Sequence, residues 1–123
     1  MKMPQIVDKN RLMTQTNEKR HEIRVDPDDP EVVMEVWVRD MTFFDVQKAA
    51  QKMFIVEEGN VSFDLEAYWR YAFQNFVTRT NPKLSTDEML NLSAYIGEQI
   101  STHLPKPTEL AEAIQGDFTK ANR

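Results

Sequence analysis

A run of apolar residues at helical spacing lies in the middle of the chain and limits its possible folds more than any other segment. The apolar positions follow the spacing i, i+3, i+4, i+7, i+8, i+11 and i+12, and they are Leu65, Tyr68, Trp69, Ala72, Phe73, Phe76 and Val77. This spacing gathers the side chains on one side of an α-helix. The pattern predicts a helix from about Ser62 to Arg79, which we expect to be the central element of the core.

Two segments that alternate polar and apolar residues precede this helix, at residues 21–25 and 31–39. One face of the second segment is apolar and comprises Val32, Met34, Val36 and Val38, while Trp37 belongs to the other face. Such alternation is typical of strands buried on one side. Two prolines and three aspartates in residues 26–30 predict a turn between them. The sequence therefore predicts a β-hairpin over residues 21–39.

Capping and breaking residues divide the remaining chain into helices. Thr42 with Asp45, and Ser85 with Glu88, have capping-box spacing. The first helix is expected to end near Gly59 and the central one at Asn81-Pro82. Apolar residues after Ser85 fit one helix to His103 or two shorter ones, and a last short helix is expected from Thr108 to Gly116.

These elements predict an α+β fold that is mainly α, with the N-terminal β-hairpin followed by a small bundle of about four helices. We expect a flexible N-terminal segment at residues 1–20, one globular domain at 21–116 with its helices in 42–116, and a frayed tail at 117–123. No internal repeat is expected, because no period recurs along the chain.

Composition and charge exclude several classes of function. The 123 residues include no cysteine and three glycines, which excludes thiol chemistry, cysteine-based metal sites and glycine-rich phosphate loops. The net charge is -5, and the acidic residues concentrate after residue 24, which disfavours binding to nucleic acid. No apolar run reaches the length of a membrane helix or forms a secretory signal, so we expect neither a membrane nor an export role.

No set of residues in the sequence fits a catalytic site. The acidic residues 26–31 lack the Gly and Glu positions of a calcium loop, which favours a solvated turn. His21 and His103 are the only histidines, and neither has the neighbours that zinc binding or nucleophilic catalysis needs. We therefore expect a protein that is not an enzyme and has no cofactor and no metal.

Aromatic residues are the most informative group, because twelve occur in a short chain. Phe43 and Phe44 are adjacent, Tyr71 lies off the central stripe, and Trp37 lies opposite the apolar strand face, so the core cannot cover them all. Aromatic and methionine side chains are favoured at interfaces. The candidate protein-binding residues are Trp37, Phe43, Phe44, Tyr71 and Tyr95.

The order of these features resembles the tail assembly chaperones of long-tailed bacteriophages. The resemblance extends from Val32 to Gly116 and contains no catalytic motif. Its parts are the strand Val36–Arg39, Met41-Thr42 before a helix, the aromatic helix, the polar break at 78–84, the capped helix at 85–88, the segment 95–100, Leu104-Pro105 and the closing helix at 109–114.

The resemblance implies a non-enzymatic chaperone in the host cell cytoplasm that coats the tape measure protein and helps recruit tail tube subunits. Self-association is a further expected interaction. The alternative is a structural component of the virion, such as a tail, neck or baseplate protein, which would assemble through the hairpin and the N-terminal segment.

Overall fold

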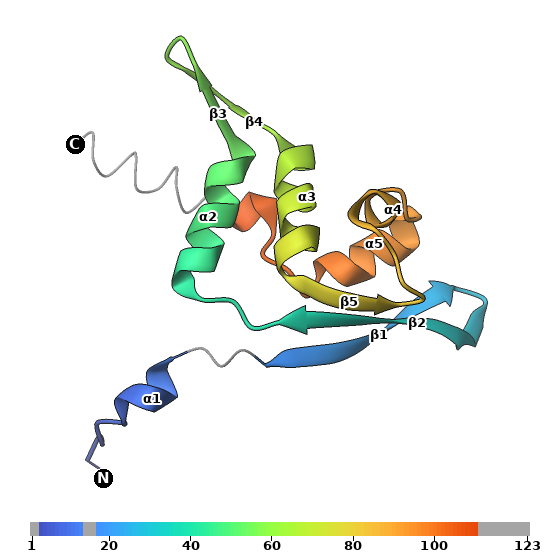
Figure 1. Ribbon diagram of the computed structural model, residues 1–123, viewed down its shortest axis with the longest axis horizontal. Helices are drawn as coiled ribbons and strands as arrows, with labels where there is room; N and C mark the ends of the chain where they lie inside the picture. Colours follow the sequence, from blue (N-terminus) through green and yellow to red (C-terminus); the bar gives the residue numbers. More distant parts are fainter. Residues whose placement is uncertain (1–2, 14–16, 111–123) are drawn as a thin grey trace.

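The computed structural model describes residues 3–13 and 17–110. A short helix near the N-terminus leads into strands and helices that alternate along the chain (Figure 1). In chain order they are α1 (Lys9–Leu12), β1 (Glu18–Asp26), β2 (Asp29–Arg39), α2 (Phe43–Met53), β3 (Phe54–Glu57), β4 (Asn60–Phe63), α3 (Leu65–Asn75), β5 (Val77–Asn81), α4 (Thr86–Leu90) and α5 (Ala94–Ser101). Residues 107–110 are also helical, and the expected helix end at Gly116 and tail at 117–123 lie outside the described residues.

The prediction of a mainly α fold with a hairpin followed by a helix bundle is wrong. About 41% of the described residues are helical and about 31% are in strands. Strands β1, β2 and β5 form a three-stranded antiparallel sheet in the order β1-β2-β5, and β3 pairs with β4 in a separate two-stranded sheet. The fold is α+β with two sheets, and the expected N-terminal hairpin is the larger part of the first one.

The first error concerns the end of the central helix. Helix α3 ends at Asn75, and Val77–Asn81 instead pairs with β2, with Trp37 opposite Arg79. The segment from Val77 to Thr80 contains three β-branched residues, which favour a strand. Val77 is buried in the strand and also fits the apolar spacing of the helix, so that spacing alone did not show where the helix ends.

The second error concerns Gly59, which was expected to cap the first helix. Helix α2 ends at Met53, and Gly59 instead forms the tight turn between β3 and β4. Glu58 and Gly59 have φ angles of 50° and 81°, the pair of positive values that a two-residue type I′ hairpin turn requires. Glu57 and Asn60 face each other across this turn.

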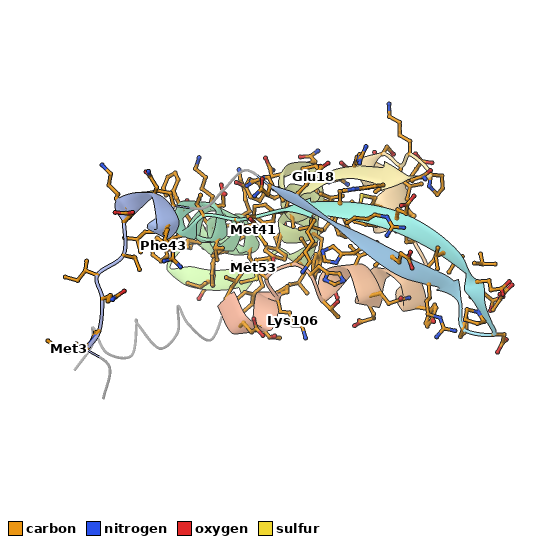
Figure 2. All side chains as sticks on the ribbon, turned by 90° about the horizontal axis from the view of Figure 1, so that it is seen from below. Met3, Glu18, Met41, Phe43, Met53 and Lys106 are labelled. Carbon is orange, nitrogen blue, oxygen red and sulfur yellow. The ribbon has the colours of Figure 1, made fainter. Side chains whose placement is uncertain are left out.

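The core lies between the three-stranded sheet and the helices on one side of it (Figure 1). The inner sheet face supplies Ile23, Met34, Val36 and Val38. Tyr68 from α3 and Phe76, directly after its end, are fully buried. The Tyr68 hydroxyl donates a hydrogen bond to the carbonyl of Pro105. Figure 2 looks from below onto the opposite face of this sheet, from which residues 3–13 extend at one end and the β1–β2 turn at the other.

Candidate protein-interaction surfaces

The charged side chains of the described residues lie at the surface and do not gather into a cluster that could hold a metal ion. No charged or polar residue among them is buried, and no three His, Asp or Glu side chains converge. Nor does any helix in residues 3–13 and 17–110 combine the length and apolar character needed to cross a bilayer.

The β3–β4 hairpin projects beyond the ends of α2 and α3 (Figure 1). Phe54 lies opposite Phe63 and Val56 opposite Val61, so all four side chains belong to one face of the hairpin, which we call the hairpin surface. Val56 is 70% exposed, Val61 56% and Phe63 48%. The rings of Phe54 and Phe63 lie 5.3 Å apart and form the base of this face. It is an uncharged apolar surface in contact with water.

The other face of this hairpin differs in chemistry. Ile55 lies opposite Ser62, and Glu57 opposite Asn60, so polar groups predominate there. In the described part of the chain β3 and β4 pair only with each other, which leaves both outer edges free. A two-stranded hairpin of this kind is marginally stable in water without a layer packed on it. The hairpin surface is therefore suited to pack against an apolar partner.

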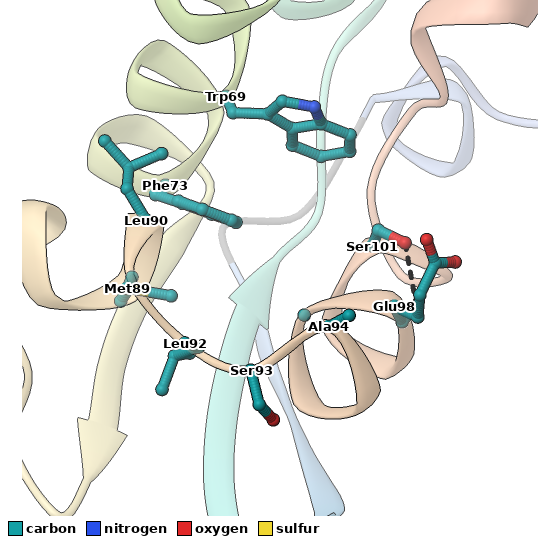
Figure 3. Close-up of a pocket in the computed structure, with 10 residues that line it drawn as sticks. Trp69, Phe73, Met89, Leu90, Leu92, Ser93, Ala94, Glu98 and Ser101 are labelled. Atoms are coloured by element: carbon teal, nitrogen blue, oxygen red, sulfur yellow. Dashed lines mark hydrogen bonds between the residues drawn. The ribbon is translucent and has the colours of Figure 1, made fainter.

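A second candidate is an apolar groove between α3, α4 and α5 (Figure 3). Trp69 and Phe73 form one wall, and Gly97 lies on the opposite wall, where a β-carbon would meet no atom within 4 Å. The groove has a volume of about 250 Å³ and is open to solvent. Its remaining lining residues are Met89, Leu90, Leu92, Ser93, Ala94, Glu98 and Ser101.

The elements around this groove are acidic. They contain Glu66, Asp87, Glu88 and Glu98 against one base, Arg70. Arg70 pairs with Asp87 at 2.6 Å and with Glu66 at 3.2 Å. Glu88 accepts a hydrogen bond from the Ser85 backbone in a capping box, as predicted. Glu98 is exposed at the rim and forms no ion pair with any residue that the structure describes, so it is available to a cation.

The predicted binding residues lie on four different elements of the fold. Phe43 and Phe44 are exposed on the first turn of α2, where Phe43 is 81% exposed and Lys48 lies over the Phe44 ring at 4.7 Å. Tyr95 is exposed on α5. Tyr71 is half-buried and meets Phe76 edge to face at 5.9 Å. These side chains therefore belong to separate elements.

Trp37, the fifth predicted residue, lies half-buried on the outer face of the three-stranded sheet. The guanidinium of Arg79 covers its ring at 3.9 Å. Beside it Arg20 bonds to Glu35, whose other oxygen accepts from Asn81 at 2.8 Å. The hydrogen bond from Arg20 lowers the pKa of Glu35. Arg20, Glu35 and Arg79 on this face are therefore all engaged in contacts within the chain.

The free edge of β1 is partly covered by α5. The Gln99 amide accepts from the backbone N–H of Arg24 at 2.9 Å and donates to its carbonyl at 2.8 Å. Next to it the rings of His21 and His103 stack with centroids 3.6 Å apart. Burial lowers the pKa of both histidines, and nearby positive charge, including Lys19, lowers it further. Burial in this contact therefore favours the neutral form of both imidazoles.

Sequence reasoning missed both the hairpin surface and the groove. Val56 and Val61 flank Glu58-Gly59, and β-branched residues around a two-residue turn with Gly were the available signal for the hairpin. The groove had no comparable signal, because Trp69 and Phe73 fit a buried stripe equally well. No family model matches the chain, and no curated protein or solved structure is significantly similar to it.

Proposed function

We propose that this protein is a non-enzymatic binding protein whose hairpin surface packs against the apolar stripe of a helical partner. The exposure of Val56, Val61 and Phe63 on one uncharged face is the observation that carries this proposal. A sheet face and a helix stripe are complementary layers, and each removes the other's apolar area from water. The contact supplies the second layer that a two-stranded hairpin lacks.

The partner we propose is a tape measure protein, with this chain acting as a tail assembly chaperone in the host cell cytoplasm. The support is the resemblance in element order from Val32 to Gly116 together with the hairpin surface. A long helical protein with exposed apolar stripes can bind many copies of a small protein along its length. Several weak contacts along one chain then give strong overall binding through avidity. The net charge of -5 helps to keep such a complex soluble. Recruitment of tail tube subunits belongs to the same proposal.

The test is co-expression of this protein with the tape measure protein encoded beside it, with complex formation measured by gel filtration. Val61→Lys places a charge on the hairpin surface, and Ser62→Lys places the same charge on the opposite face one residue away. We expect Ser62→Lys to retain the complex and Val61→Lys to weaken it at least about tenfold, because a charge would be desolvated at the contact. Equal binding by the two variants, or no complex with the wild type, would contradict the proposal.

A structural role in the virion is the second candidate, and the free edge of β1 favours it. Among the described residues, β1 pairs on one side with β2, and on its other edge the Gln99 side chain bonds to the backbone of Arg24 alone. Edge strands with free backbone groups pair readily with other chains. Mass spectrometry of purified particles distinguishes the roles, because a structural component would be present in fixed stoichiometry and a chaperone would be scarce.

A further inference from the structure

The segment of residues 3–13, which we call the arm, exposes apolar side chains without covering them. Ile6 is fully exposed, Leu12 is 70% exposed, and Met3 and Met13 are also exposed. Each such side chain would gain free energy if it were buried against an apolar surface. The arm contains two bases, Lys9 and Arg11, and one acid, Asp8, so it carries a net positive charge.

The arm and the groove of the same molecule lie apart. In both views the arm extends outward from the start of β1, past the beginning of α2 (Figures 1 and 2). The groove opens instead between α3, α4 and α5. The hydrogen bonds of the arm stay within it, as in the bond from the Arg11 N–H to the Asp8 carbonyl at 3.0 Å, and none reaches a groove residue in the described chain.

The two surfaces are complementary in charge and in size. Glu98 is the one charged residue that lines the groove, and it is acidic, whereas the arm has a net positive charge. At about 250 Å³ the groove is smaller than the 300–1,000 Å³ usual for small-molecule pockets, so it suits an apolar anchor side chain. Leu12 is such a side chain, and Lys9 and Arg11 lie close to it in sequence. The exposed carboxylate of Glu98 at the rim is positioned to meet one of these cations.

We propose that the arm of one copy of this protein docks in the α3–α4–α5 groove of a second copy, with Leu12 in the groove and a basic arm residue beside Glu98. The contact joins two different surfaces, so it is head-to-tail and can extend from copy to copy into rings or chains. It uses neither Val56 nor Val61, so it stands independently of the proposed binding to a helical partner. Copies linked in this way would coat a long partner in register.

Sedimentation equilibrium over a range of concentrations tests this proposal with two full-length variants. Gly97→Trp fills the groove from a position where added atoms meet open space, and Leu12→Asp removes the anchor while leaving the groove intact. We expect the wild type to associate beyond a dimer as concentration rises, and each variant alone to lose at least about tenfold in association constant. An equimolar mixture should form a heterodimer that does not extend, because only one arm and one groove remain.

A second pair of variants tests the same contact and does not require that Gly97→Trp folds correctly. Glu98→Lys reverses an exposed rim charge and should weaken association, and the combined change Lys9→Glu, Arg11→Glu in a second protein should restore binding to it. A wild type that stays monomeric at all concentrations overturns the proposal. So does wild-type association by Leu12→Asp, or a mixture of Gly97→Trp and Leu12→Asp that stays monomeric although circular dichroism shows both folded.

Discussion

The chain contains two β-hairpins that differ in how they are supported. The β1–β2 hairpin is long, gains β5 as a third strand, and packs its inner face on the helices. The β3–β4 hairpin is short, has no third strand among the described residues, and leaves its apolar face in water. Both have tight turns: Asp26 accepts from the Asp28 N–H at 2.9 Å in one, and Glu58-Gly59 forms the other.

The difference separates a hairpin that helps to form the core from one that leaves an apolar face exposed. On the supported hairpin, apolar side chains such as Val36 face the core, and the outer face pairs its charges around Trp37. On the projecting hairpin, Val61 and Phe63 have no such cover. A folded protein gains stability from the first arrangement and a site for association from the second. Substitutions in the two hairpins should therefore affect different measurements.

The largest effect is expected from Ile23→Ala in the supported hairpin. Ile23 is 1% exposed, and its removal leaves a cavity between β1 and the helices. We expect a loss of about 2–5 kcal/mol in the free energy of unfolding. Urea denaturation followed by circular dichroism measures this loss. A cost below about 1 kcal/mol would contradict the assignment of β1 to the core.

A smaller effect is expected from Thr42→Ala, at the start of the helix that joins the two hairpins. The Thr42 hydroxyl accepts from the Asp45 N–H at 3.0 Å, and the Asp45 carboxylate accepts from the Thr42 N–H at 3.0 Å. Loss of the cap should lower the free energy of unfolding by about 0.5–2 kcal/mol. Thr42→Ser keeps a hydroxyl at this position and should retain most of the stability of the wild type. Equal urea midpoints for the two variants would show that the cap does not contribute.

The same cap predicts a response to strong acid. The hydrogen bond from Arg39, followed by that from the Thr42 backbone, lowers the pKa of Asp45 to about 2. A lowered carboxyl pKa stabilises the fold above the ordinary value near 3.8, and this contribution disappears as the pH falls towards 2. Urea denaturation at pH 7 and at pH 2.5 measures the free energy of unfolding of the wild type and of Asp45→Asn. The difference between the two proteins should be smaller at pH 2.5 than at pH 7.

A milder pH effect is expected where α5 covers the edge of β1. The pKa values of His21 and His103 are lowered in the fold, so the unfolded chain takes up protons at a higher pH than the native one does. Stability should therefore decrease as the pH falls from 7 to 5, by less than the loss from Thr42→Ala. Thermal unfolding across this range should show that the midpoint temperature of His103→Gln depends less on pH than that of the wild type. An unchanged slope would exclude the stacked pair as its source.

The smallest effect on stability is expected from Val61→Ala in the projecting hairpin. Val61 is 56% exposed, so its truncation should change the free energy of unfolding by no more than about 0.5 kcal/mol. Comparison with Ile23→Ala measures directly how much more the β1–β2 hairpin contributes to the stability of the fold than the β3–β4 hairpin does. A loss as large as that of Ile23→Ala would show that the projecting hairpin is part of the core.

The supported hairpin was predictable because its pattern and its burial agree. Met34, Val36 and Val38 alternate in the sequence and are buried, and the Thr42 and Ser85 capping boxes are confirmed. Val32 shares this alternation but is exposed, because the hairpin tip extends beyond the helices. Periodicity records which side chains share a face, and the tertiary structure decides which faces are covered.

The projecting hairpin and β5 were not predictable by the same reasoning. Phe54 to Phe63 forms strands of four residues each, too short for alternation to stand out beside a helix pattern. Val77 continues the helical spacing of α3 although the backbone has already become a strand. The groove depends on the packing of three helices, which no local pattern specifies.

Hydrogen exchange measured by mass spectrometry, on this protein alone and with the tape measure protein that we propose as its partner, tests the central claim most directly. The account predicts fast exchange of the amides in residues 54–63 of the free protein, because this hairpin has no covering layer, and strong protection of the same amides in the complex. A complex that protects other segments while residues 54–63 exchange as fast as before would contradict it.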